Sequence, residues 1–162
     1  KAVGGECVLV ADVGQHQMFA ARRFPHSRPR CFISSGGMGT MGFGIPAAIG
    51  ASFANRDEKV VAVLGDGGAQ MTAQELLVAA DENLPITFVV FNNSSLGLVR
   101  QMQEEYFVGK FTNPDFTKLA RAYKIASRKG SDPRKLDCVM AKAVRSKKPV
   151  LVEVIIDSDA KV

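Results

Sequence analysis

The 162-residue sequence has no tryptophan, two tyrosines, two histidines and only three cysteines. Cys7, Cys31 and Cys138 form no C-x-x-C pair, which argues against a zinc cluster or a disulfide framework and favours buried thiols in a reducing cytosol. No apolar run approaches the ~20 residues of a membrane-spanning helix, and no signal-peptide pattern is visible. We therefore expect a cytoplasmic protein with no membrane partner.

Acidic residues are scarce toward the C-terminus. Residues 121–148 hold ten of the 21 Lys and Arg residues, against Asp132 and Asp137 alone. Such a patch could serve nucleic acid, but it contains one aromatic residue, Tyr123, and no nucleic-acid-binding motif. A solvated helix face is the simpler interpretation. We expect no nucleic-acid partner, and keep an RNA-binding or purely structural module as a third hypothesis.

Short apolar segments alternate with segments of helical pattern along the whole chain, 46% of which is hydrophobic. The strands expected from this alternation are 7–12, 31–34, 59–66, 86–93, 124–127 and 150–156. The helices expected between them are 15–23, 45–55, 72–82, 94–105, 115–122 and 133–146. Three of the strands are rich in Val, Ile and Phe without polar alternation, which is typical of parallel strands covered on both faces. We therefore predict an α/β fold, a doubly wound, mostly parallel six-stranded sheet with helices on both faces, as a single domain over residues 1–162.

Three local signals predict where helices begin. Thr72 and Glu75 have the spacing of a capping box, which places the start of the third helix at Thr72. Pro46 suits the first turn of the second helix. The sequence Asn113-Pro114-Asp115 predicts a turn that leads into the fifth helix.

The segment Gly37-Met38-Gly39-Thr40-Met41-Gly42 matches G-x-G-x-x-G between an expected strand and an expected helix. This is the form of the dinucleotide-binding fingerprint, in which glycines let the backbone approach a pyrophosphate. That fingerprint follows the first strand of its fold, however, whereas this loop follows the second candidate strand. Because of this difference, a nicotinamide-dependent dehydrogenase is the second-ranked hypothesis and stays only as an alternative.

Four consecutive strands end in glycine, carboxylate or carboxamide residues, and the carboxyl ends of parallel strands are where such sheets bind ligands. Asp66 and Asn93, 27 residues apart, end the third and fourth strands. If these strands are neighbours, a carboxylate, a carboxamide oxygen and a backbone carbonyl reach one point, which is a donor set suited to Mg²⁺ or Ca²⁺. Gly67 and Gly68 would let the backbone approach a diphosphate. A lone G-D-G or N-N is usually only a turn, so the prediction depends on their combination.

In combination, "GDGGAQMTAQELLVAADENLPITFVVFNN" resembles the thiamine-diphosphate signature, in which G-D-G is followed by roughly 25–30 residues and then N-N. The segments "VGQHQMFAA" and "SGGMGTMGFGIPAAIGA" are similar, more narrowly, to the C-terminal cofactor domain of acetohydroxyacid synthases (acetolactate synthases). The resemblance runs from about Val10 to Phe111, and more weakly to Ile156. It implies the thiamine-diphosphate-binding fold with thiamine diphosphate and Mg²⁺, and leaves open FAD on a domain outside this chain.

The resemblance also implies roles for individual residues. Asp66, Asn93 and the main-chain carbonyl of Ser95 would hold Mg²⁺, and Met41 would keep the cofactor bent. His16 would donate a hydrogen bond to the diphosphate, which fits a histidine beside ionised phosphate better than general-base catalysis does. The full set implied to contact the cofactor is Gly14, Gln15, His16, Gly39, Met41, Gly65, Asp66, Gly67, Gly68, Asn93, Ser95, Leu96, Gly97 and Leu98.

The implied reaction decarboxylates pyruvate and joins the two-carbon unit to a second 2-oxo acid. Another thiamine-diphosphate decarboxylase or oxidase stays open. The catalytic glutamate of such enzymes comes from a pyrimidine-binding domain that we cannot assign to this chain, so we predict no catalytic residue here and an inactive isolated chain. We expect that domain, from the same or another polypeptide, and further copies of the chain as partners. Met102 stands where the family often has tryptophan, and its role is left open.

Overall fold

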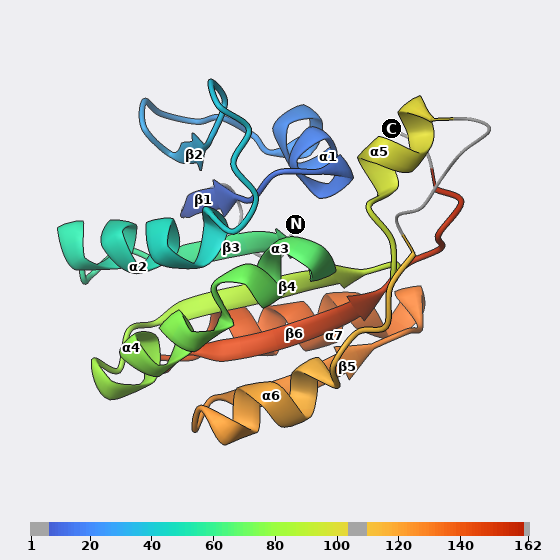
Figure 1. Cartoon of the computed structure of the whole chain (residues 1–162). Helices are drawn as coiled ribbons and strands as arrows, with labels where there is room; N and C mark the ends of the chain where they lie inside the picture. The colour runs from blue at the N-terminus through green and yellow to red at the C-terminus, as the bar shows by residue number, and fades with distance from the viewer. Residues whose placement is uncertain (1–6, 104–109, 161–162) are drawn as a thin grey trace.

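The computed structural model describes residues 7–103 and 110–160 of the chain. Its centre is a six-stranded sheet in the order β2-β1-β3-β4-β6-β5, in which every pairing is parallel (Figure 1). The strands are β1 Val8–Ala11, β2 Phe32–Ser34, β3 Val60–Gly65, β4 Ile86–Asn92, β5 Ala126–Gly130 and β6 Val150–Ile155. The predicted α/β class and the six-stranded parallel sheet are confirmed.

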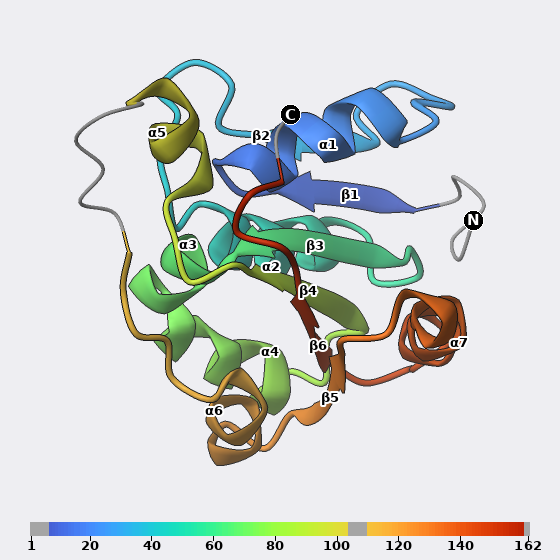
Figure 2. The same cartoon turned by 90° about the vertical axis from the view of Figure 1, so that its right-hand side faces the viewer.

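Helices cover both faces of the sheet, as Figure 2 shows with the sheet seen from the side. One face carries α2, α3, α4 and α6, and the other carries α1 and α7. The helices are α1 Gln15–Arg23, α2 Gly44–Ala54, α3 Asp66–Met71, α4 Leu76–Asp81, α5 Gly97–Met102, α6 Phe116–Ala122 and α7 Pro133–Val144, with a 3₁₀ turn, η1, at Ala73–Glu75.

The central strands supply most of the core, because their side chains alternate between the two covered faces. Leu64, Phe88 and Val90 pack under the larger helical layer with Ile45 of α2. Val61, Val89 and Val152 belong with Ala143 of α7 to the core of the opposite face. Burying each such large apolar side chain contributes ~1.5–3 kcal/mol, so the sheet forms a rigid base for the loops at its carboxyl edge.

Two predicted helix starts are wrong. The segment expected as one helix over 72–82 is the 3₁₀ turn η1 followed by α4, and a separate helix, α3, precedes it from Asp66. Thr72 occupies the N-cap position of η1 but makes no capping hydrogen bond, because its hydroxyl donates to the carbonyl of Gly42 at 3.0 Å. A tertiary contact has thus replaced the local capping box. The helix expected from Ser94 begins at Gly97, since Ser94 has a left-handed φ of 52° that interrupts helical geometry. The expected end of that helix, at residues 104–105, lies outside the described residues.

Other local predictions hold. Asp115 caps α6 by accepting hydrogen bonds from the N–H groups of Thr117 and Lys118, both at 3.0 Å. Pro46 lies in the first turn of α2. The strand expected at 124–127 is shifted to Ala126–Gly130, because Lys124 has a left-handed φ of 60° and turns the chain before the strand begins.

The basic segment 121–148 forms the end of α6, β5, α7 and the turn that follows. All ten of its Lys and Arg residues are exposed, as a solvated surface requires. No helix among the described residues is long and apolar enough to cross a membrane.

Candidate functional site

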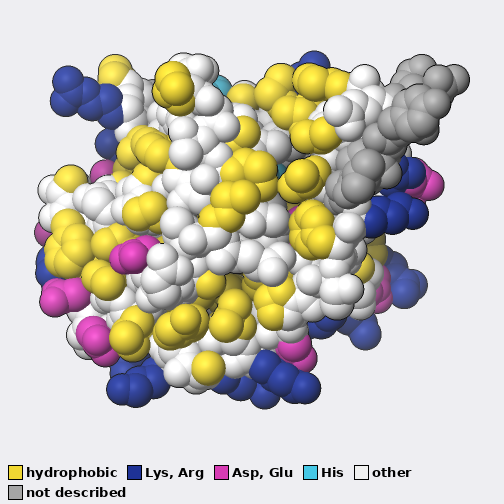
Figure 3. All heavy atoms as spheres, in the orientation of Figure 1, with side chains coloured by type: hydrophobic (Ala, Val, Ile, Leu, Met, Phe, Trp, Pro, Cys, Tyr) yellow, Lys and Arg dark blue, Asp and Glu magenta, His cyan; other side chains and the backbone are white. Residues whose placement is uncertain are grey.

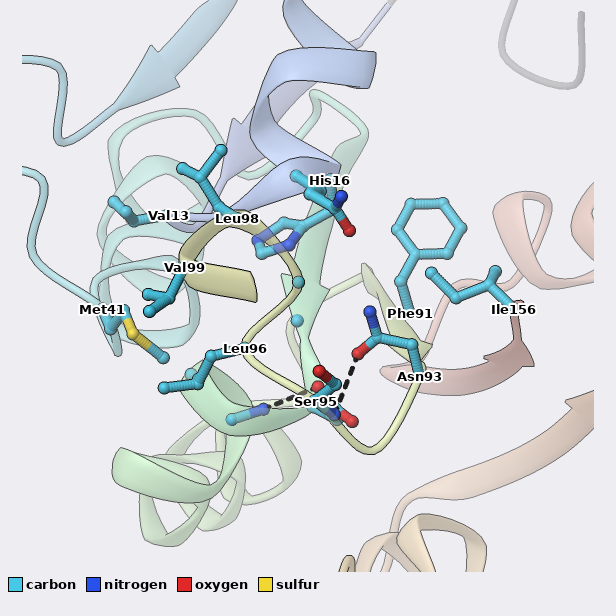
Figure 4. A pocket seen from close by; sticks show the side chains of 17 residues that line it. Val13, His16, Met41, Phe91, Asn93, Ser95, Leu96, Leu98, Val99 and Ile156 are labelled. Atoms are coloured by element: carbon cyan, nitrogen blue, oxygen red, sulfur yellow. Dashed lines mark hydrogen bonds between the residues drawn. The ribbon is translucent and has the colours of Figure 1, made fainter. Parts of the chain in front are cut away.

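A pocket opens at the carboxyl ends of β1, β3 and β4. The chain leaves β1 for the edge strand β2 and returns on the other side of β1 to form β3, so β1 and β3 border a topological switch point. In open parallel sheets this is where connecting loops diverge and ligands bind. The pocket is lined by Val13, Gly14, Gln15, His16, Met41, Gly65, Asp66, Gly67, Gly68, Phe91, Asn93, Ser95, Leu96, Gly97, Leu98, Val99 and Ile156 (Figure 4).

The structure brings together thirteen of the fourteen residues that the resemblance assigned to the cofactor. The exception is Gly39, which occupies the turn before Met41 with a left-handed φ of 63° and does not line the pocket. The glycine-rich loop follows the edge strand β2, away from the switch point, and contributes only Met41. This arrangement is unfavourable to the dinucleotide hypothesis, which needs the glycines themselves against a pyrophosphate.

Asp66 and Asn93 come from neighbouring strands, as the prediction of a shared site required. Gly65 pairs with Phe91 in register, so the two chains leave the sheet side by side. The Asp66 carboxylate accepts the N–H of Ser94 on Oδ2 at 2.7 Å, which joins it directly to the loop that carries Asn93. The Asn93 amide oxygen accepts the N–H of Ser95 at 3.1 Å, so its carboxamide is held beside the Ser95 backbone (Figure 4).

Further polar side chains support this carboxylate from the side of the sheet. Asn113 donates through Nδ2 to Asp66 Oδ2 at 2.7 Å and to Asn92 Oδ1 at 2.8 Å. Asn92 in turn donates to Glu153 Oε1 at 2.7 Å. Burial raises the pKa of Asp66, and the hydrogen bonds from Asn113, Gly67 and Ser94 oppose that rise. The site therefore holds a buried carboxylate whose pKa lies above its ordinary value and which accepts hydrogen bonds from three donors.

His16 lies at the start of α1 with its ring turned into the pocket (Figure 4) and is 7% exposed. Burial lowers its pKa to about 4, against a weaker opposing effect of a hydrogen bond to the Asp12 backbone, so the ring is neutral near pH 7. Its Nε2 has no hydrogen-bond partner among the described residues, and neither has the buried Oγ of Ser95. Two buried polar atoms without partners at one pocket indicate that a polar ligand belongs there.

Glycines bring the walls of the pocket close together. A Cβ on Gly97 would lie 2.1 Å from Gln15 Oε1 and 2.9 Å from Asn93 Nδ2. A Cβ on Gly65 would lie 2.7 Å from Cε1 of His16, and one on Gly67 would lie 3.2 Å from Cε of Met41. These positions accept no side chain without displacing a neighbour, which keeps the backbone open to a ligand.

The donor set fits Mg²⁺ and a diphosphate. It contains one carboxylate, one carboxamide oxygen and backbone carbonyls, all hard oxygen donors. Within residues 7–103 and 110–160 there is no group of three or more His, Cys, Asp or Glu side chains that could hold a metal by themselves. An ion bound with so few protein charges takes its remaining ligands from water and substrate phosphates, which is how Mg²⁺ is commonly bound.

Sequence reasoning missed several residues of the site. Phe91 and Ile156 contribute apolar wall and gave no signal beyond their place in apolar strands. Glu153 did have a signal, because it is the only charged residue in the otherwise apolar segment 150–156. Asn113 was read only as a turn residue, and its contact with Asp66 spans 47 residues of sequence.

Comparison with known proteins agrees with the geometry. The acetolactate synthase isozyme 3 large subunit of Escherichia coli K12 is 43% identical over 162 aligned residues, covering 94% of this chain and 28% of that protein. The acetolactate synthase large subunit of Lactococcus lactis is 44% identical, covering 94% of this chain and 27% of that protein. The chain thus spans little more than a quarter of the length of these relatives. Residues 12–154 match the family described as thiamine pyrophosphate enzyme, C-terminal TPP binding domain, and the chain belongs to that family.

Proposed function

We propose that the chain is the thiamine-diphosphate- and Mg²⁺-binding part of an acetolactate-synthase-type enzyme, which decarboxylates pyruvate and joins the two-carbon unit to a second 2-oxo acid. The observation that best supports this proposal is that Asp66, Asn93 and Ser95 line one pocket, at the ends of two neighbouring strands. The names of the relatives support the narrower choice among thiamine-diphosphate enzymes. A decarboxylase or oxidase with the same cofactor is the alternative, and product analysis separates the three.

In this proposal Asp66, Asn93 and the Ser95 carbonyl hold Mg²⁺, and the ion holds the diphosphate. Gln15, His16, Gly67 and Gly68 contact the diphosphate, Leu96, Gly97 and Leu98 line its far side, and Gly14 and Gly65 admit it between β1 and β3. Backbone groups of Gly39 and Met41 bond the aminopyrimidine. When bound, thiamine diphosphate supplies a nucleophilic carbon that releases carbon dioxide from a 2-oxo acid. The chain's own part is to bind, orient and exclude water.

We propose a pyrimidine-binding domain and a second copy of the chain as partners. Helices α3, α4 and α5 expose large apolar side chains, including Met71 of α3 at 56%, Met102 of α5 at 75%, and Leu77 and Val78 of α4. Figure 3 shows several groups of exposed apolar side chains on this face of the molecule. Clustered apolar exposure marks interaction surfaces. All three cysteines are free, in line with the proposed cytoplasmic location.

The test is calorimetric titration of the chain with thiamine diphosphate, once in Mg²⁺ and once in EDTA. We expect binding that requires the metal and that Asp66→Ala abolishes. NAD⁺ and NADP⁺ serve as comparison ligands, since a dehydrogenase would bind one of them regardless of EDTA. Tight binding of a nicotinamide cofactor, or cofactor binding that is indifferent to both EDTA and Asp66→Ala, would refute the proposal.

A further inference from the structure

We propose that Asn113 is a positioning residue that fixes the Asp66 carboxylate for the metal ion, and that Glu153, acting through Asn92, fixes the orientation of the Asn113 amide. This inference rests on the proposed function and deepens it. Its basis is a directional chain of hydrogen bonds that runs from β6 to the end of β3.

The direction of the chain is set at Glu153. A carboxamide can occupy its place in two orientations that exchange oxygen and nitrogen, and its partners decide between them. An ionised carboxylate only accepts hydrogen bonds, so Asn92 must turn Nδ2 toward Glu153 Oε1, at 2.7 Å. Asn92 Oδ1 then faces the other way, where it accepts from Asn113 Nδ2 at 2.8 Å.

Asn113 is constrained from two sides. Its Oδ1 accepts a hydrogen bond from Gln70 Nε2 at 2.8 Å, so its Nδ2 must point toward Asn92 and Asp66. The reversed amide would set its oxygen against the carboxylate of Asp66 and the oxygen of Asn92. Both contacts would then be repulsive, and a single orientation is favoured.

The consequence is an asymmetric carboxylate on Asp66. Oδ2 accepts two short hydrogen bonds, from Asn113 Nδ2 and from the Ser94 N–H, both at 2.7 Å. On Oδ1, by contrast, the described residues place one hydrogen bond of good geometry, from the N–H of its neighbour Gly67 at 3.0 Å. Oδ1 therefore keeps the free lone pair, and we assign it as the oxygen offered to the ion.

Burial of the Glu153 carboxylate costs desolvation free energy, so a specific role is expected for this residue. It is 1% exposed in a strand whose neighbours are apolar. Its counter-charge is Lys129, its cross-strand partner, with Nζ 3.3 Å from Oε2. The ion pair lacks hydrogen-bond geometry, and Oε2 accepts no other hydrogen bond from the residues that the structure describes. Only the glutamate end of this ion pair is buried, since the Lys129 side chain is 54% exposed. Burying a carboxylate costs free energy that a single ion pair commonly does no more than offset, and the attested use of such polar groups is to specify one arrangement.

The test compares Asn113→Ala and Glu153→Gln with two controls at the opposite edge of the sheet, Asn55→Ala and Glu82→Gln. Glutamine has nearly the shape of glutamate but can also donate, so it no longer dictates the Asn92 orientation. For each variant, calorimetry gives the dissociation constant of thiamine diphosphate with Mg²⁺ and with Ca²⁺. Thermal unfolding of the ligand-free chain reports stability separately.

We expect both test variants to bind the cofactor with Mg²⁺ about tenfold or more weakly, the range seen when groups that orient metal ligands are removed. The loss with Ca²⁺ is expected to be clearly smaller, because Mg²⁺ demands near-octahedral ligands whereas Ca²⁺ tolerates irregular ones. The controls should match the unmodified chain with both ions. A merely structural role would weaken binding with both ions alike.

Equal losses with the two ions, or unchanged affinity in Asn113→Ala, would overturn the proposal. Unchanged affinity in Glu153→Gln alone would overturn the claim that Glu153 orients the Asn113 amide through Asn92, and would leave the role of Asn113 standing. If Glu153→Gln fails to fold, Asn113→Ala decides, since its side chain lies partly exposed on a loop. An unmodified chain that binds the cofactor with neither ion refutes the proposed function itself, whereas normal binding in the chain and in both variants refutes only the positioning.

Discussion

The buried carboxylate of Asp12, at the end of β1, accepts the backbone N–H of Gly42 through Oδ2 at 3.2 Å, across 30 residues of sequence. Oδ1 accepts the N–H of Val13 at 2.8 Å, and the backbone N–H groups of Phe43 and Gly44, at the start of α2, act with these two hydrogen bonds to oppose the rise in the Asp12 pKa that burial causes. A Cβ on Gly68 would lie 2.2 Å from Oδ2. One side chain thus joins the loop after β1 to the loop that carries Met41.

Replacing Asp12 should loosen both loops. Asp12→Ala leaves the N–H groups of Val13 and Gly42 without this acceptor, at ~1–3 kcal/mol each, so we expect the free energy of unfolding to fall by about 3 kcal/mol. Cofactor affinity should fall as well, because Met41 loses its anchor. Urea denaturation and calorimetry measure the two effects. Asp57→Ala, at an exposed position, is the control, and equal stability of the two variants would contradict this role for Asp12.

Replacement by alanine should have opposite effects at Gly97, in the pocket, and at Gly50, on the surface. Gly97→Ala would push Cβ into Gln15 and Asn93, so we expect cofactor affinity with Mg²⁺ to fall about tenfold or more. Gly50 is exposed on α2, and a Cβ there would meet no atom within 4 Å other than the adjacent backbone of its own helix. Gly50→Ala should therefore stabilise the chain by about 0.5–1 kcal/mol and leave binding unchanged. Similar affinities for Gly97→Ala and Gly50→Ala would show that the pocket is not used.

Stability should depend on pH through His16. Its pKa is about 4 in the folded chain and 6.5 as the ordinary value, so protonation favours the unfolded state. The contribution of neutral His16 to the free energy of unfolding is fully retained above pH 6.5 and is lost as pH falls toward 4, by roughly 3 kcal/mol at most. Burial raises the pKa values of Asp12 and Asp66, which acts in the opposite direction, so the informative curve is the difference between the chain and His16→Gln. A flat difference between pH 7 and pH 4 would contradict a buried neutral His16.

The chain alone should form no acetolactate from pyruvate in the presence of thiamine diphosphate and Mg²⁺. The reason is that the glutamate expected to activate the cofactor belongs to a pyrimidine-binding domain. Colorimetric product detection checks this, with and without such a domain from a relative added in trans. Robust turnover by the chain alone would mean that one of its own residues performs the glutamate's task.

Much of the site could be predicted because its parts are local. The apolar runs around residues 59–66 and 86–93 indicated buried parallel strands, and parallel strands deliver their carboxyl ends to one edge. Asp66 and Asn93 were expected at one edge if those strands were neighbours; β3 does pair with β4, and both residues line the pocket. The capping box at Thr72 failed because its hydroxyl bonds Gly42, a partner that local spacing cannot reveal.

By itself the sequence determined the alternation of strands and helices, and hence which loops share an edge, because hydrophobic periodicity depends on near neighbours in the chain. Only the tertiary structure decided what surrounds those loops. The contacts of Asp12 with Gly42, of Asn113 with Asp66 and of Asn92 with Glu153 join residues 30, 47 and 61 positions apart. Such pairings depend on strand order and burial, since a polar side chain finds its partner only after the sheet has excluded water from both.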